Sequence, residues 1–139
     1  MKKRTILLIL VLILSTAAYY GYPFLLRACL NVSGALRISP EFKDAVFKPN
    51  TMLFIILKND GEIPVAVKKI INPSFPLNFS VTPRNLMLPD LLAPKLRLEV
   101  QINQHGQIGT FKTGDMRGEL KDPVFIFSRG LQLVIDTKY

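Results

Sequence analysis

The sequence is poor in the residues that catalytic and metal centres need. Its 139 residues include one cysteine, Cys29, one histidine, His105, and no tryptophan. A single cysteine excludes an intramolecular disulfide, and the paired Cys and His residues of a structural zinc site are missing. The chain also lacks a Ser-His-Asp or Cys-His set in which a base activates a nucleophile. We therefore expect neither an enzyme nor a protein that holds a metal, a cofactor or a small-molecule substrate.

The individual candidates for chemistry point the same way. His105 lies in Asn103-Gln104-His105-Gly106, which has the composition of a hairpin turn, so we expect an exposed histidine that is neither a metal ligand nor a catalytic base. Asp115 and Glu119 are the closest pair of carboxylates, but Arg117 lies between them. Gly114 precedes Asp115 and Gly118 precedes Glu119, and these glycines indicate a tight turn or bulge rather than acid-base work.

Charge does not indicate a nucleic-acid partner. The formal net charge is +8, but residues 1–29 hold four basic residues and no acidic one, which leaves 14 basic and 10 acidic residues in 30–139. Within that region only Lys68 and Lys69 are adjacent, and no basic stripe interleaved with aromatic residues appears. A solvated surface explains this pattern.

The N-terminal segment predicts a membrane anchor. Residues 5–26 form an uncharged run of 22 residues, which is long enough to span a bilayer as a helix. Lys2, Lys3 and Arg4 precede the run, so the positive-inside rule places the rest of the chain on the far side of the membrane. In a bacterium this is the inner membrane, with the following domain in the periplasm.

Two other fates of this segment stay open. Small residues at 15–18 offer a signal-peptidase site, which would make the segment a cleaved signal peptide. Leu26-Arg27-Ala28-Cys29 resembles a lipoprotein box, which makes Cys29 a candidate for lipidation, whereas an unmodified thiol is the simpler expectation. The tyrosines Tyr19, Tyr20 and Tyr22 suit the aromatic belt at a membrane interface and favour the retained anchor.

The remainder of the chain reads as short strands separated by turns. Apolar residues alternate with polar ones or form short apolar runs, and the expected strands are 31–39, 51–58, 63–71, 75–82, 95–103, 116–120 and 130–137. One helical turn is expected at 41–46. We predict an all-β fold, a single Ig-like antiparallel β-sandwich of about seven strands, with a small barrel as the alternative. The domains are then 1–29, the anchor or signal segment, and 30–139, the sandwich.

Proline within these strands is informative because it cannot donate to a sheet ladder. Pro64 should begin a strand and Pro73 should lie in a connection. Pro76 follows Phe75 in an alternating segment, so it should mark an edge strand or a bulge.

The order of these segments resembles the C-terminal Ig-like domain of the CycH (CcmI) type cytochrome c biogenesis proteins. The resemblance covers residues 31–137, and its segments in order are Pro64-Val65-Ala66-Val67-Lys68, Phe75-Pro76-Leu77-Asn78-Phe79, Leu86-Met87-Leu88-Pro89 and Thr113-Gly114-Asp115-Met116-Arg117-Gly118. Proteins of this family are anchored in the inner membrane and carry a helical-repeat (TPR) domain that holds the apocytochrome. The present sequence passes from the anchor into the sandwich without such repeats, and Gln101 stands where the family commonly has arginine.

The resemblance implies a membrane-tethered, non-catalytic accessory protein of c-type cytochrome maturation, which would contact haem-ligation components or apocytochrome c. The alternative is a small structural or interaction subunit of a respiratory or other membrane complex. Docking is expected on the outward faces of the strands or by strand addition at an exposed edge. Arg97, Gln101 and His105 are the expected contributors to that partner surface.

Overall fold

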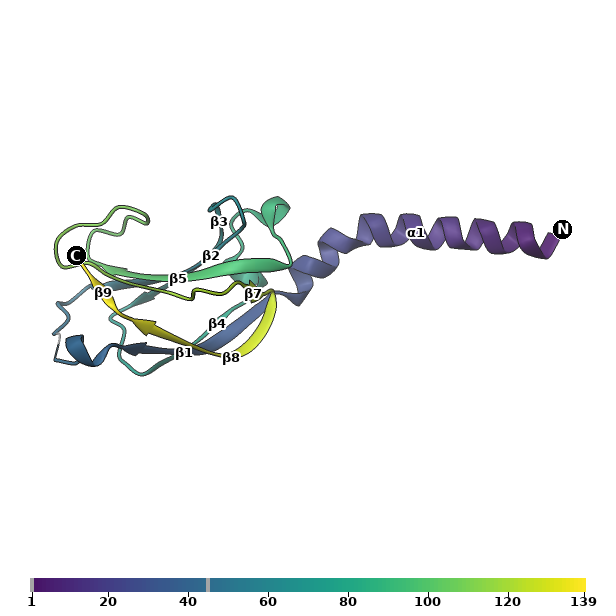
Figure 1. Ribbon diagram of the computed structural model, residues 1–139. Helices are drawn as coiled ribbons and strands as arrows, with labels where there is room; N and C mark the ends of the chain where they lie inside the picture. The colour runs from purple at the N-terminus through teal and green to yellow at the C-terminus, as the bar shows by residue number, and fades with distance from the viewer. Residues whose placement is uncertain (1, 45) are drawn as a thin grey trace.

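The computed structural model describes residues 2–44 and 46–139, which form one long helix followed by a β-rich domain (Figure 1). Helix α1, Lys2–Cys29, has 28 residues and no buried side chain. It is the one helix in this part of the chain that is long and apolar enough to cross a membrane. The strands of the domain run along roughly the same axis as α1, so the domain has one end at the helix and one end opposite it.

Each of the seven predicted strands is present. They are β1 Asn31–Ile38, β2 Met52–Lys58, β3 Pro64–Ile71, β4 Leu77–Val81, β5 Lys95–Asn103, β6 Met116–Glu119 and β8 Phe127–Ile135. Two strands of two residues each, β7 Val124–Phe125 and β9 Thr137–Lys138, were not predicted because so short a segment shows no alternation. Of the helical turn expected at 41–46, residues 41 and 42 belong to the 3₁₀ turn η1 Pro40–Phe42, and residue 45 lies outside the described residues. Two further 3₁₀ turns, η2 Pro83–Asn85 and η3 Pro89–Leu91, are not predicted by the sequence pattern.

The strands form two sheets. The smaller has the order β4-β1-β8, and the larger has the order β3-β2-β5-β6-β9, with β7 added alongside β5. The expectation of wholly antiparallel pairing is wrong at one place, because β1 and β8 are parallel from Asn31↔Phe127 to Ile38↔Ile135. Parallel neighbours need a long connection, and here all of β2 to β7 supplies it.

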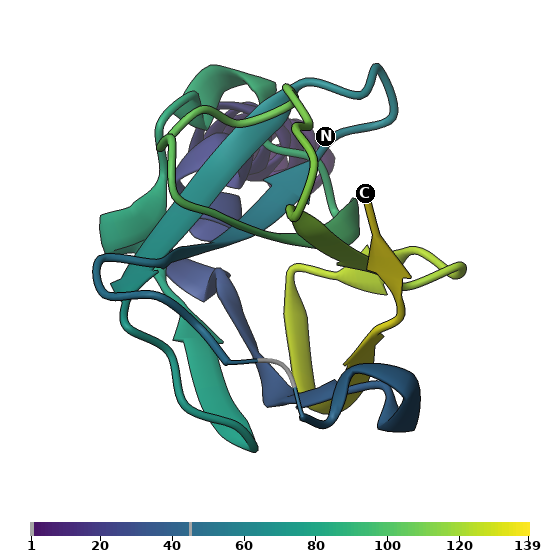
Figure 2. The ribbon, with the colours of Figure 1, turned by 90° about the vertical axis from the view of Figure 1, so that its left-hand side faces the viewer.

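The core lies between the two sheets, as the view from the end opposite α1 shows (Figure 2). Alternate residues of each strand point into it because successive side chains of a strand face opposite sides. Fully buried members include Val32 and Leu36 from the small sheet and Ile55, Leu98 and Val100 from the large one.

Two glycines allow the backbone of β8 to come close to its neighbours. A Cβ on Gly34 of β1 would lie 2.1 Å from the carbonyl oxygen of Leu131, beside a register shift between β1 and β8. A Cβ on Gly118 of β6 would lie 2.7 Å from the carbonyl oxygen of Val134. Any larger residue at either position would displace β8.

The prolines lie at strand ends. Pro64 is the first residue of β3, and Pro73 is buried in the connection to β4. Pro76 follows a cis peptide bond with Phe75 and directly precedes β4, which is an edge strand of the small sheet. The edge prediction for Pro76 is therefore confirmed, although the strand begins after the proline rather than around it.

Candidate partner-binding site

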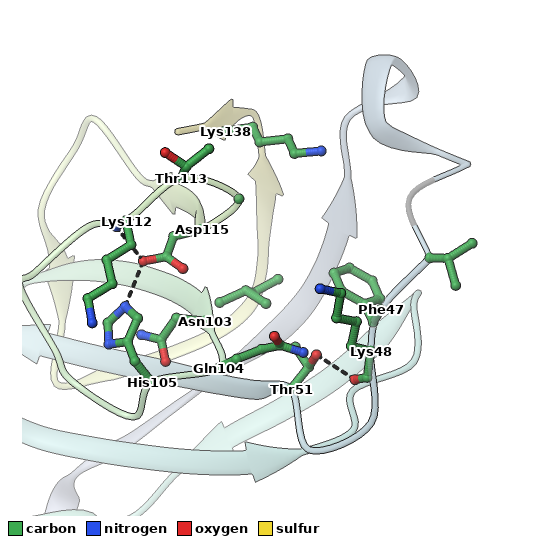
Figure 3. A pocket seen from close by; sticks show the side chains of 13 residues that line it. Phe47, Lys48, Thr51, Asn103, Gln104, His105, Lys112, Thr113, Asp115 and Lys138 are labelled. Carbon is green, nitrogen blue, oxygen red and sulfur yellow. Dashed lines mark hydrogen bonds and ion pairs between the residues drawn. The ribbon is translucent and has the colours of Figure 1, made fainter.

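A pocket of about 420 Å³ lies at the end of the domain opposite α1 (Figure 3). It is lined by parts of three segments, 46–51, 102–105 and 112–115, together with Lys138. These segments meet here because β5 ends at Asn103, β6 begins at Met116 and β9 ends at Lys138. This pocket is therefore the first candidate for a functional site.

His105 lies in the wall of this pocket and binds Asp115. The distance from its Nε2 to Asp115 Oδ2 is 2.7 Å, and only 14% of the His105 side chain is exposed. The backbone N–H of Gln107 donates to His105 Nδ1 at 3.1 Å, so Nδ1 carries no proton and Nε2–H donates to Asp115. The expectation of an exposed turn histidine is thus wrong, because the partner of His105 lies ten residues further along the chain.

Asp115 anchors the same loop from the other side. It is 6% exposed, and its Oδ2 also accepts the backbone N–H of Lys112 at 2.8 Å. Gly114, with a φ of +97°, makes the turn before it and donates its N–H to the carbonyl oxygen of Tyr139. The His105–Asp115 pair therefore fixes the shape of the loop between β5 and β6.

The lining of the pocket carries an excess of positive charge. Lys48, Lys112 and Lys138 come from three different segments, and no carboxylate of the described chain lies within salt-bridge distance of any of them. The lining also includes the apolar side chains of Phe47 and Ile102. Such a combination suits an acidic segment of a protein chain, whose carboxylates would pair with these lysines while its apolar groups pack against Phe47 and Ile102.

The polar side chains of His105 and Thr51 in the pocket are engaged in hydrogen bonds within the domain. Both ring nitrogens of His105 are engaged within the loop, and the hydroxyl of Thr51 donates to the carbonyl oxygen of Lys48 at 2.7 Å. Within residues 2–44 and 46–139, no three His, Cys, Asp or Glu side chains lie close enough together to hold a metal ion. What the geometry supports is binding.

A buried charged cluster lies on the outer face of the large sheet. Glu99 of β5 is 1% exposed, and its oxygens lie 2.6 Å from Lys58 Nζ, 3.0 Å from Arg117 Nε and 2.7 Å from Gln101 Nε2. Burial raises the pKa of Glu99, but Lys58, Gln101 and Arg117 together lower it by more, so its net pKa lies below the ordinary value. Glu99 is therefore held ionised inside the protein.

Gln101 is buried as well, at 1% exposure, which overturns its placement on an open partner surface. The loop after β5 covers it, and Gly109 N–H donates to its Oε1 at 3.0 Å. The sequence did contain a signal for this cover. In β2 the residues facing the same outer side, Phe54 and Ile56, are also buried, and they belong to the continuous apolar run 53–57. Such a run indicates a strand covered on both faces.

The other predicted residues are scattered over the molecule. Arg97 is exposed at the α1 end, where its Nη1 lies 2.8 Å from Glu62 Oε1. Cys29 is a free, exposed thiol at the last residue of α1. Glu119 does not join Asp115 but binds Arg117 at 2.9 Å. The structure thus brings none of Arg97, Gln101 and His105 together into one surface.

Comparisons with known proteins identify the β-rich domain. A protein of Aquifex aeolicus (strain VF5) described as uncharacterized is 33% identical over 89 residues, which are 63% of this chain and 59% of that protein's length. An alternative pilotin from the type II secretion system of Vibrio cholerae superposes with a TM-score of 0.46 at 9% identity, covering 76% of this chain and 94% of the pilotin. Residues 32–136 match the family described as the Ig-like domain of cytochrome c-type biogenesis protein H. Because that match covers most of the chain, including both sheets, the protein belongs to the family of Ig-like domains of cytochrome c-type biogenesis protein H.

Proposed function

We propose that this protein is a membrane-tethered, non-catalytic accessory protein of c-type cytochrome maturation. Its β-rich domain lies in the periplasm and α1 is retained in the bacterial inner membrane. The family match over residues 32–136 carries the proposal, because it ties the whole domain to cytochrome c biogenesis. The positive residues Lys2, Lys3 and Arg4 before α1 support the orientation.

The join between helix and domain supports retention of α1. Leu30 directly follows the last helical residue and is 1% exposed in the domain core, and Asn31 N–H donates to the carbonyl oxygen of Ile126 at 2.8 Å. Arg27 of α1 also pairs with Asp90 at 2.5 Å. The helix end is thus part of the folded domain, whereas a cleaved leader would be joined by an exposed linker.

The partner is a protein, and it docks at the pocket opposite α1 through an acidic segment. Haem-ligation components and apocytochrome c are the partners that the family suggests. Lys112 and Lys138 would pair with the acidic segment, while the His105–Asp115 pair holds the loop in the binding shape. Arg97 contributes only if the partner extends along the domain toward the membrane.

A haem stain of membrane and periplasmic proteins tests the maturation role. The comparison uses a strain without this gene, its parent and a complemented strain, with immunoblots for the apoproteins. Loss of haem from several c-type cytochromes while apoprotein persists is the expected result. An unchanged haem pattern would reject the role and favour a subunit of another membrane complex, to be identified by stoichiometric co-purification.

Charge reversal tests the docking site in the same strains. Lys112→Glu combined with Lys138→Glu should fail to restore haem attachment although the protein reaches the membrane at the normal level. Lys69→Glu, on an exposed position of β3 away from the pocket, is the matched control and should complement fully. Full complementation by the pocket variant would show that partners dock elsewhere.

A further inference from the structure

Exposed apolar side chains gather at the end of the domain next to α1. Outside α1, the described chain exposes ten large hydrophobic side chains, and six of them lie at this end. They are Ile63, Met87, Leu88, Leu91, Phe125 and Phe127, with exposures from 41% to 62%. We call these six residues the rim. A soluble surface rarely concentrates apolar groups in this way without a partner.

The rim comes from several segments that meet where the chain leaves α1. Phe127 pairs with Asn31, the first residue of β1, and Phe125 pairs with Lys95, the first residue of β5. Leu91 accepts a hydrogen bond from Asn59, in the turn between β2 and β3. These contacts place the rim around the base of the helix, where α1 enters the domain (Figure 1).

The ion pair between Arg27 and Asp90 fixes the depth of the rim. The uncharged run 5–26 is about 33 Å long as a helix, close to the roughly 30 Å of a bilayer's hydrocarbon core. Arg27 therefore lies at the boundary between hydrocarbon and headgroups, and Asp90, which belongs to η3, lies at the same level. Tyr22 and Phe24 of α1 face Pro89 and Leu92 across a shared pocket, so η3 reaches beside the span itself.

Basic side chains accompany the aromatic ones. Lys95 Nζ lies 5.6 Å from the ring centre of Phe125, and Arg129 Cζ lies 4.8 Å from that of Phe127. Arg84, Lys95 and Arg129 have no carboxylate partner among the described residues, whereas Arg97 neutralises Glu62. Asp60 and Asp122, which lies just before β7, are acidic residues at this end that have no ion-pair partner in the described chain. Aromatic and basic groups together are typical of surfaces that lie in the headgroup layer of anionic membranes.

We infer that the rim is a membrane-contact surface that rests on the periplasmic leaflet of the bilayer around α1. This inference rests on the proposed retention of α1 as an anchor. No linker separates α1 from β1, so the rim cannot move away from the bilayer while the helix spans it. The apolar side chains enter the interface, and Arg84, Lys95 and Arg129 face anionic headgroups.

Spin labels on the full-length protein in lipid nanodiscs test the inference. In a Cys29→Ser background, single cysteines are introduced by Leu91→Cys, Phe125→Cys, Ile71→Cys or Leu12→Cys, and each is labelled with a nitroxide. The nanodiscs contain phosphatidylglycerol and phosphatidylcholine only. Power-saturation measurements give the collision rate of each nitroxide with oxygen, which enters the bilayer, and its collision rate with a water-soluble nickel chelate. The two rates are then compared for each label. Circular dichroism of each variant checks that the domain is folded.

Labels at 91 and 125 should collide more with oxygen than with nickel, as a bilayer contact requires, and the label at 71 should show the reverse. The label at 12 separates the two proposals. If it is in the bilayer while those at 91 and 125 are fully aqueous, the inference is overturned and the anchor stands. If the label at 12 is aqueous, the retained anchor itself is wrong.

Charge-reversal substitutions and a change of lipid composition test whether the rim contacts lipid or another membrane protein. The double substitution Lys95→Glu and Arg129→Glu should move the label at 91 toward nickel in phosphatidylglycerol nanodiscs and have less effect in phosphatidylcholine alone. If labels at 91 and 125 are protected in native membranes but aqueous in pure lipid, the rim binds a membrane protein and the bilayer proposal fails.

Discussion

Replacing Glu99 with glutamine should destabilise the domain by about 3 kcal/mol, because it breaks a buried ion pair from one side. Glu99 is 1% exposed, and the Lys58 side chain that contacts it is only 16% exposed. Glutamine has nearly the same shape, so packing is preserved while the Lys58 ammonium and the Arg117 guanidinium lose the charge that they face. The measurement is urea unfolding of the full-length protein in detergent micelles, followed by far-ultraviolet circular dichroism with the helical signal subtracted.

The difference in unfolding free energy between wild type and Glu99→Gln should also depend on pH. Because the pKa of Glu99 is lowered in the folded protein, its contribution to stability is complete above the ordinary value of 4.5 and is lost as the pH falls through the lower folded pKa. The difference in unfolding free energy between wild type and Glu99→Gln should therefore be constant near neutral pH and shrink below that value. A difference that grows on acidification would contradict the lowered pKa.

A double substitution supplies the control. Glu99→Leu with Lys58→Met removes both charges of the Glu99–Lys58 pair and replaces them with apolar groups of similar size, which is often neutral for a buried pair, while Arg117 keeps Glu119 as its partner. We expect the double variant to lie within about 1 kcal/mol of wild type. If Glu99→Gln alone is as stable as wild type, the cluster contributes nothing and the reasoning from burial is refuted.

Two further substitutions test features of the fold. Gly34→Ala should cost about 3 kcal/mol or more, because its Cβ would lie 2.1 Å from the Leu131 carbonyl oxygen, whereas Gly61→Ala, whose nearest contact is 3.4 Å, should change the urea midpoint little. Equal midpoints for the two variants would contradict the close approach of β1 and β8. His105→Ala should lower the unfolding free energy by about 1 kcal/mol through loss of the hydrogen bond to Asp115. A His105→Ala protein that unfolds at the wild-type midpoint would indicate that the loop holds its shape without this bond.

The strand positions could be predicted because alternation is a local property. In β5 the inward residues Leu96, Leu98 and Val100 were all assigned correctly. Alternation also identifies the residues on the opposite face of β5, but it does not show whether that face is exposed to water. This basis places Glu99 and Gln101 on the outward side, and the loop that covers Gln101 is a tertiary feature supplied by residues beyond the strand.

Which strands pair, and which distant residues meet, could not be predicted from the sequence for the same reason. The parallel match of β1 with β8 joins the first and last long strands of the domain, and nothing in either segment records the direction of the other. The contact of His105 with Asp115 likewise spans a loop whose path depends on the backbone turn at Gly114. The basic pocket needs Lys48, Lys112 and Lys138 to converge from distant segments, and single-residue charge counts cannot show that.

The length of β5 sets the distance between the α1 end of the domain and the pocket. It begins at Lys95 beside the base of α1 and ends at Asn103 in the wall of the pocket, and its eight steps of about 3.3 Å span roughly 26 Å. If α1 is retained in the membrane as proposed, its direct connection to β1 would hold the pocket at a nearly constant height above the lipid headgroups. A partner that docks as proposed would then have to present its acidic segment at that height, in a thin layer parallel to the membrane. Shortening or lengthening the strand would shift the layer without altering the pocket.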